Sequence, residues 1–329
     1  MKPNRLHLAA SLGAVFVLGI IAGVAPSPIH RHLEKAFTFD SEYQHGGNHR
    51  YAFVSPLLLC GETRFDHVGN DVMLELEQQL DSYVDSAKQS GKAGVVGIYF
   101  RQLKGGPWLG VDYEHEFAPG SLLKVPLAMA IEKAAESNPS LLAQEVFYES
   151  GDTAHLQYFK NVAVTPGKAY TVQGLLEAML VHSDNNAADL LASVLTDEQL
   201  QDAYHTLGVS APNRTGDYVT NVHYYSSFFR ILYNATYLSP DRSEELLKTL
   251  AKSTYTQGLV AGVPDTTVVS HKFGERALQN GSAVQLHDCG IIYHPERPYL
   301  LCVMTQGQDF AKLSAVIRDI SKIVWESVD

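Results

Sequence analysis

The segment PGSLLKVP, residues 119–126, places a serine and a lysine three residues apart at the start of an apolar run. Pro119 and Gly120 interrupt the preceding pattern, and serine is favourable at a helix N-terminus. Ser121 and Lys124 are therefore predicted to lie on one face of a helix. A serine hydroxyl becomes a nucleophile when a base is within hydrogen-bond reach, and lysine serves where its pKa is lowered. So short a motif needs support from other elements.

Strand-like and helix-like patterns occur in separate blocks around this segment. Residues 70–91 have helical periodicity, and apolar runs at 93–103 and 108–113 predict a hairpin. The segment 137–171 is polar and irregular. Further helices are predicted at residues 171–182, 185–195, 197–207, 221–238, 239–253 and 309–327. Further strands are predicted at residues 267–273, 283–293 and 298–305.

This order predicts an α/β fold of the α+β type: an antiparallel sheet of about five strands flanked by helices, with an inserted all-helical subdomain. Within one domain at 70–329, the sheet part is 70–137 and 265–329, and the helical part is 138–264. Residues 30–69 are interpreted as a linker and docking segment, in which the apolar run YAFVSPLLLC is expected to pack on the domain.

Residues 8–25 are uncharged and largely apolar, and Lys2 and Arg5 precede them. Residues 1–29 are thus interpreted as an export signal or a membrane anchor. The length of the run favours an uncleaved anchor with its N-terminus in the cytoplasm, whereas the small residues 23–25 leave cleavage and secretion open. Either alternative places the remaining chain outside the cytoplasm.

Composition excludes one class of partner and leaves the thiol chemistry open. The chain has 329 residues and a formal net charge of −11, and we find no basic patch to bind nucleic acid. Cys289 and Cys302 flank a turn signal, so they either face each other as a disulfide or remain buried thiols. We expect a monomer.

Two further motifs carry candidate chemistry. SDN, residues 183–185, stands between two predicted helices, where its simpler interpretation is a helix stop followed by an N-cap. KFG, residues 272–274, comes late in a strand, where its simpler interpretation is an edge-strand lysine. A glycine there also permits close backbone approach.

SxxK, SDN and K-x-G in this order are the motif set of class A β-lactamases and penicillin-binding proteins. The stretches TVQGLLEAMLVHSDNNAADLL and GLVAGVPDTTVVSHKFGE also resemble that family. The resemblance covers roughly residues 72–328 and implies a serine hydrolase with a β-lactamase/transpeptidase-like fold. It implies no metal or organic cofactor, and a β-lactam or a cell-wall peptide as substrate.

The resemblance implies a catalytic role for four residues. Ser121 would attack the carbonyl and form an acyl-enzyme, while Lys124 accepts its proton. Ser183 would relay a proton toward the leaving nitrogen. Lys272 would supply positive potential for the substrate carboxylate and help to lower the pKa of Lys124.

Residues beside the motifs would bind the substrate. Asn185 would hydrogen-bond a side-chain amide of the substrate, and Asp184 would hold the helix junction. Gly274 would allow close backbone approach, and the backbone N–H of Glu275 would complete an oxyanion hole with that of Ser121.

The chain departs from the family pattern at two places. Phe273 stands where the family has a hydroxyl residue that grips the carboxylate; Arg276 is either its replacement or an ordinary solvated arginine. The second departure is the absence of ExxLN, whose glutamate activates the deacylating water, between SDN and KFG. DYVTN, residues 217–221, is either an echo with Asp217 as the base or a helix N-cap at Asn221.

Three functions follow from this pattern. The leading interpretation is a serine hydrolase that cleaves a β-lactam or related amide. The alternative is a D,D-peptidase or penicillin-binding protein with slow deacylation. A binding module at the membrane that does not turn over its ligand belongs to a different class.

Overall fold

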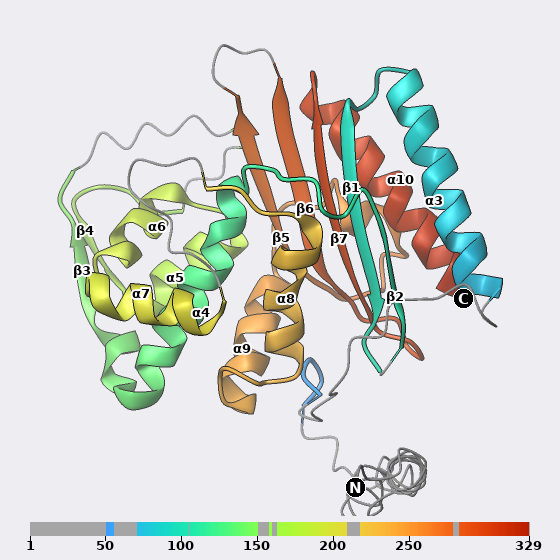
Figure 1. The fold of residues 1–329 in the computed structure, drawn as a ribbon. Coiled ribbons are helices and arrows are strands. Elements are labelled where there is room, and N and C mark those ends of the chain that lie inside the picture. Colours follow the sequence, from blue (N-terminus) through green and yellow to red (C-terminus); the bar gives the residue numbers. More distant parts are fainter. Residues whose placement is uncertain are drawn as a thin grey trace, which may run out of the picture. The chain divides into compact units, whose positions relative to one another are not determined.

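An antiparallel sheet with strand order β2-β1-β7-β6-β5 forms the centre of the fold (Figure 1). The computed structural model describes residues 51–55, 71–104, 106–150, 158–159, 163–208, 218–278 and 283–328. The strands are β1 (Val95–Gln102), β2 (Trp108–Val111), β5 (Val269–Ala277), β6 (Val284–Ile292) and β7 (Tyr299–Gly307). Segments from both ends of the domain therefore build one five-stranded sheet, which confirms the predicted fold class.

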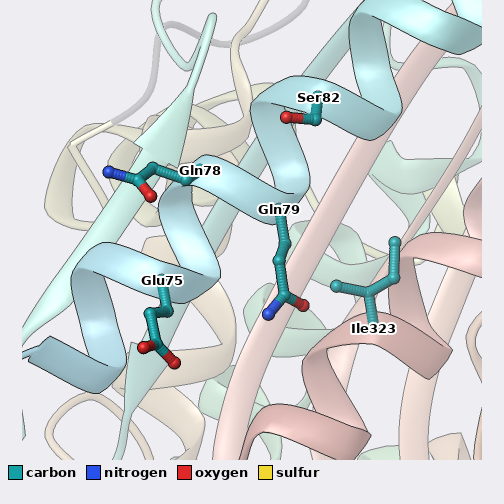
Figure 2. A pocket seen from close by; sticks show the side chains of 5 residues that line it. All are labelled: Glu75, Gln78, Gln79, Ser82 and Ile323. Atoms are coloured by element: carbon teal, nitrogen blue, oxygen red, sulfur yellow. The ribbon is translucent and has the colours of Figure 1, made fainter.

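Helices α3 (Asp71–Gln89) and α10 (Phe310–Val328) pack against one face of this sheet (Figure 1). Leu76 and Leu80 of α3, and Ile317 and Ile320 of α10, recur at helical spacing and are buried. The two helices also border a shallow cavity of about 470 Å³ (Figure 2). Its lining residues are Glu75, Gln78, Gln79, Ser82 and Ile323. None of them is a predicted site residue.

The other face carries the helical part of the fold. Its helices are α4 (Lys124–Ser137), α5 (Val172–Val181), α6 (Asn185–Ala192), α7 (Asp197–Thr206), α8 (Val222–Tyr233) and α9 (Pro240–Leu250). Short 3₁₀ turns lie at η2 (Gly120–Leu123), η3 (Pro139–Ala143) and η4 (Leu259–Gly262). The expectation of an all-helical insert is wrong in one detail, because β3 (Glu145–Tyr148) and β4 (Lys168–Thr171) pair as a small antiparallel sheet. In β3, Val146 and Tyr148 face the core while the apolar Phe147 between them is 57% exposed, so the sequence shows no alternation of apolar and polar residues that would predict a strand.

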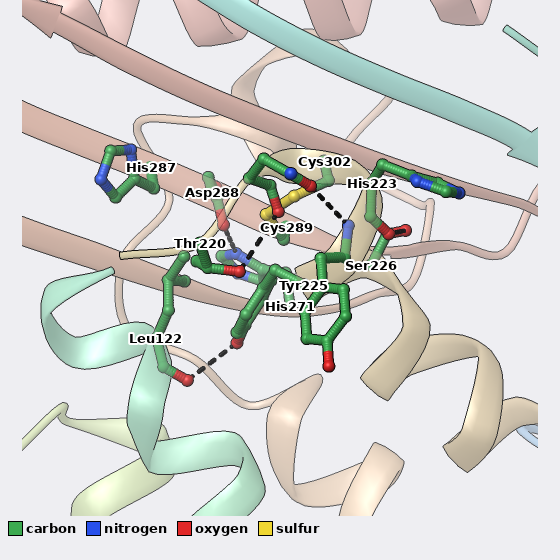
Figure 3. Close-up of a disulfide and its surroundings, with 12 residues drawn as sticks. Leu122, Thr220, His223, Tyr225, Ser226, His271, His287, Asp288, Cys289 and Cys302 are labelled. Carbon is green, nitrogen blue, oxygen red and sulfur yellow. Dashed lines mark hydrogen bonds and ion pairs between the residues drawn. A yellow bond between two sulfur atoms is a disulfide. The ribbon is translucent and has the colours of Figure 1, made fainter. Parts of the chain in front are cut away.

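Cys289 and Cys302 are paired directly across β6 and β7 and form a disulfide (Figure 3). This settles the alternative that the sequence leaves open. Both residues are fully buried, on the face that α8 covers. Tyr225 of α8 lies beside the disulfide in Figure 3 and donates a hydrogen bond to the backbone oxygen of Leu122 at 2.9 Å. The disulfide region is thereby connected to η2, which carries Ser121.

The first described residues, 51–55, are held by the carboxylate of Glu244 on α9. It accepts hydrogen bonds from the backbone N–H groups of Ala52, Phe53 and Val54 at 2.9, 2.7 and 3.1 Å. Phe53 also packs edge-on against Tyr293 at the end of β6. This part of the predicted docking segment therefore contacts the domain, whereas residues 56–60 lie outside the described residues.

The predicted anchor or signal at residues 8–25 also lies outside the described residues. Among the helices that the structure describes, none is long and apolar enough to cross a membrane.

Candidate active site

Close contact between η2 and the edge strand β5 positions Ser121. Gly120 has a φ of +55°, and a Cβ there would lie 2.5 Å from the Glu275 carbonyl oxygen. A Cβ on Gly274 would lie 2.4 Å from the Pro119 carbonyl oxygen. Only glycine at both positions allows the two backbones to meet this closely. The geometry explains the glycine of KFG and brings Ser121 next to the strand that carries Lys272.

The Lys124 ammonium lies at the centre of the site. Its Nζ is 3.1 Å from Ser121 Oγ, 3.2 Å from Ser183 Oγ and 2.6 Å from Asn185 Oδ1, and it also donates to the Ser183 carbonyl oxygen. The lysine is 5% exposed, and burial lowers its pKa from 10.5 to about 7, although Asp184 and other carboxylates act in the opposite direction. Lys124 therefore has a substantial neutral fraction at neutral pH, in contact with the hydroxyl that it would deprotonate.

The SDN motif forms the turn between α5 and α6. Ser183 adopts a left-handed conformation with a φ of 55° and is fully buried, which turns its hydroxyl toward the two lysines. Asp184 is the N-cap of α6: its carboxylate accepts from Ala187 N at 3.0 Å and from Ala163 N at 2.7 Å. The N-cap interpretation of SDN is confirmed, because Asp184 caps α6. Ser183 and Asn185 on either side of it both contact Lys124.

Lys272 of β5 reaches the same hydroxyl from the sheet. Its Nζ donates to Ser183 Oγ at 2.8 Å and to the Phe273 carbonyl oxygen at 2.8 Å. The Nζ also lies 4.2 Å from the centroid of the Phe273 ring. Lys272 is fully buried, and burial together with the charge of Lys124 lowers its pKa well below the ordinary value. The edge-strand position is confirmed, but this lysine points inward.

An aromatic cluster that the sequence did not predict lies beside Lys272. The Phe273 ring stacks on Tyr255, with centroids 4.3 Å apart, and meets Phe159 edge-on at 5.8 Å. The Glu275 carboxylate accepts hydrogen bonds from the backbone N–H groups of Tyr158 and Phe159. Residues 158 and 159 belong to the segment interpreted as irregular, and no local pattern indicates that they return to β5.

The structure also locates the remaining predicted residues. Asn185 opens α6, and its Oδ1 is engaged by Lys124. Arg276 is partly exposed on β5, two residues beyond Gly274 and on the same face of the strand. Asn221 Oδ1 accepts from Tyr224 N at 2.8 Å, so Asn221 is the N-cap of α8, as one of the two interpretations of DYVTN predicts. Asp217 lies outside the described residues.

Comparison with known proteins identifies the family of this chain. A family model described as the beta-lactamase enzyme family matches residues 75–328, which is more than half of the chain. The chain belongs to the beta-lactamase enzyme family. Among curated relatives, the extended-spectrum beta-lactamase PER-1 of Pseudomonas aeruginosa is 24% identical over 295 residues, covering 83% of this chain and 93% of the relative. Beta-lactamase VEB-1 of the same organism is 21% identical over 238 residues, covering 66% of this chain and 80% of the relative.

Solved structures of low sequence identity share the fold of this chain. A beta-lactamase from Chitinophaga pinensis has a TM-score of 0.67 and 20% identity, over 78% of this chain and all of that one. A mutant of PBP-A, solved as an acyl-enzyme complex with penicillin G, has a TM-score of 0.64 and 21% identity, over 78% of this chain and 97% of that one. Membership in the beta-lactamase family supports a β-lactamase-like hydrolase.

Proposed function

We propose that this protein is a serine hydrolase that cleaves a β-lactam or a related amide through an acyl-enzyme on Ser121. The observation that carries this function is the shared contact of Lys124 Nζ with the hydroxyls of Ser121 and Ser183. A nucleophile, a base with a lowered pKa and a hydroxyl that can relay a proton, all within one hydrogen-bond network, can carry out amide acyl transfer.

In this mechanism, neutral Lys124 accepts the Ser121 proton as Oγ attacks the carbonyl carbon. The backbone N–H groups of Ser121 and Glu275 stabilise the developing oxyanion. The proton then passes from Lys124 to Ser183 and on to the leaving nitrogen, since the Ser183 hydroxyl contacts both lysines. Lys272 holds that hydroxyl in place through its own hydrogen bond to it. Asn185, fixed by Lys124, presents its amide to the acyl side chain of the substrate.

We propose further that hydrolysis of the acyl-enzyme is slow. Three carboxylates act electrostatically on Lys124 in the described part of the chain, those of Asp184, Glu275 and Asp189. Asp184 and Glu275 already accept hydrogen bonds from backbone N–H groups, and the ExxLN sequence, whose glutamate activates the deacylating water in class A β-lactamases, is absent between Asn185 and Lys272. A deacylating water needs a free base, and general-base help contributes about 10²- to 10⁴-fold in rate. This favours a D,D-peptidase or penicillin-binding protein over a fast β-lactamase.

A fluorescent penicillin, followed by a chase with unlabelled penicillin, tests this function. We expect the purified domain to be labelled and the label to persist through the chase. Rapid loss of label would instead indicate a β-lactamase with efficient turnover. Failure to label at any concentration would contradict the acyl-enzyme mechanism and leave the non-turnover binding module as the better function.

We also propose that residues 8–25 hold the monomeric domain at the outer surface of the cell membrane. Support comes from the apolar run and the basic residues before it. Fractionation of cells that express the full chain should recover it in the membrane pellet. Recovery of a shortened, soluble protein from the medium would indicate a cleaved signal instead.

A further inference from the structure

Ala118, three residues before Ser121, is held through both of its backbone groups by side chains of β6. Its N–H donates to Gln285 Oε1 at 3.1 Å, and its carbonyl oxygen lies 3.0 Å from Nε2 of His287 (Figure 3). Gln285 and His287 are two residues apart on the strand, so their side chains lie on the same face of the sheet. Both are buried. Residues 118–121, the nucleophile turn, are thus attached to β6 as well as to β5.

The hydrogen bonds around His287 determine which of its ring nitrogens carries the proton. The backbone N–H of Thr305 donates to Nδ1 at 3.2 Å, so Nδ1 is the acceptor of the neutral ring and Nε2 bears the hydrogen. Nε2–H is therefore the donor to the Ala118 carbonyl oxygen. Burial lowers the pKa of His287 from 6.5 to about 4, so the ring is neutral at neutral pH and keeps this arrangement. The Phe117 ring meets the imidazole edge-on, with centroids 5.4 Å apart.

Gln285 is likewise oriented by its second hydrogen bond. Its Nε2 donates to Gln306 Oε1 on β7 at 2.8 Å, which leaves Oε1 to accept from the Ala118 N–H. Burying a glutamine or a histidine costs free energy unless its polar atoms are paired, and an apolar side chain of similar size would avoid that cost. These two buried polar side chains converge on one alanine, and what they determine together is the position of Ala118.

The chain between Ala118 and the Ser121 hydroxyl has little freedom to absorb a displacement. Pro119 has a φ of −67°, fixed by its ring, and the Leu122 N–H donates back to the Pro119 carbonyl oxygen at 3.2 Å. The glycine between Pro119 and Ser121 lies against the backbone of β5. A shift of Ala118 therefore changes the separation of Ser121 Oγ from Lys124 Nζ, which is 3.1 Å.

We propose that His287 and Gln285 are positioning residues for acylation: by binding both backbone groups of Ala118, they hold the Ser121 hydroxyl within reach of Lys124. The inference rests on the proposed function and concerns the rate of attack on the carbonyl carbon, with the affinity for the substrate unchanged. Because a misplacement of about 1 Å can slow a reaction by about 10²-fold, loss of one bond to Ala118 should lower the acylation rate by roughly 10- to 100-fold.

Two substitutions at His287 separate its two hydrogen bonds. Time courses of adduct formation by intact mass, over a range of penicillin G concentrations, give the limiting acylation rate and the half-saturating concentration. His287→Asn keeps an oxygen near the position of Nδ1 for the Thr305 N–H but loses the donor to Ala118, so the limiting rate should fall by roughly 10- to 100-fold. His287→Gln places an amide N–H near the position of Nε2, so the rate should stay within about threefold of the wild type. The half-saturating concentration should change by less than about threefold in both variants.

Gln285→Met removes the acceptor for the Ala118 N–H with little change in volume and should lower the limiting rate in the same way. Ser321→Ala is the matched control. The buried Ser321 hydroxyl donates to the Leu259 carbonyl oxygen at 2.8 Å, between α10 and η4, so its loss removes one buried side-chain hydrogen bond to the backbone away from the nucleophile turn. Ser321→Ala should lower the urea midpoint and leave the limiting acylation rate unchanged.

Several results would overturn the inference. One is a wild-type limiting rate in folded His287→Asn, and another is a loss in His287→Gln as large as that in His287→Asn. A change confined to the half-saturating concentration, or rates that follow the urea midpoints with Ser321→Ala included, would also overturn it. If His287→Asn does not fold, Gln285→Met decides. A wild type that forms no adduct overturns the proposed function, whereas variants labelled at the wild-type rate overturn this inference alone.

Discussion

The lowered pKa of Lys124 predicts a specific dependence of stability on pH, which the substitution Lys124→Met should remove. In the unfolded chain this lysine titrates near 10.5, and in the folded protein near 7. Below pH 7 both states are protonated, so the folded state carries the full penalty of a desolvated ammonium. Above pH 10.5 both states are neutral and the penalty is gone. Between these limits the unfolded chain binds more protons, so stability rises with pH.

The magnitude follows from the two pKa values of Lys124. Each pH unit in this window contributes up to about 1.4 kcal/mol, and the integrated gain from pH 7 to pH 9 is about 2 kcal/mol. The charge of Lys124 also lowers the pKa of Lys272. Removing the charge of Lys124 therefore raises the pKa of Lys272 toward its ordinary value. This change further weakens the pH dependence of the free energy of unfolding in Lys124→Met, and so increases the difference from the wild type.

Urea unfolding at pH 7, 8 and 9, followed by circular dichroism, measures this difference. We expect the wild type to gain about 2 kcal/mol more than Lys124→Met from pH 7 to pH 9. Lys133→Met is the control: Lys133 lies on the same helix, with its side chain 46% exposed, and its loss should leave the wild-type pH dependence intact. Parallel curves for wild type and Lys124→Met would refute the reasoning that desolvation makes Lys124 a base.

Three further predictions concern the reaction. Lys272→Arg should retain measurable penicillin acylation, whereas Lys124→Arg should retain almost none because arginine does not give up a proton; equal losses would contradict the division of roles. Gly274→Ala should slow acylation and lower the free energy of unfolding by about 1–3 kcal/mol, since its Cβ would meet Pro119 O at 2.4 Å; a wild-type urea midpoint would disprove this contact. The penicillin adduct should be equally long-lived in Asp217→Asn and in the wild type when followed by intact mass. If the adduct disappears within seconds in the wild type but persists in Asp217→Asn, Asp217 is the deacylation base.

Local patterns and motif order predicted most of the sheet, the major helices and the motifs that bring Ser121, Lys124, Ser183 and Lys272 together. These features depend on signals between residues close in the sequence. Leu76 and Leu80 recur at helical spacing, and a glycine-rich turn separates β1 from β2. The three motifs come together because each lies in or at the end of a helix or strand, and these elements pack against one another. They bring together Ser121, Lys124, Ser183 and Lys272.

The features that the sequence did not predict depend on contacts between distant residues. The Glu275 carboxylate binds the backbone of residue 158, which is 117 positions away. The orientation of the Phe273 ring is set by Tyr255 and Phe159, and no periodicity in the KFG strand contains that information. The lowered pKa of Lys124 likewise results from desolvation by several elements, and only the assembled fold produces it.

Formation of a covalent adduct on Ser121 is the central claim, and intact mass followed by peptide mapping tests it most directly. Wild-type protein mixed with penicillin G should gain the mass of one penicillin, and the modified peptide should contain Ser121. Ser121→Ala, with an unchanged circular dichroism spectrum, should gain none. An adduct that persists in Ser121→Ala, or one that maps to any other residue, would contradict the account.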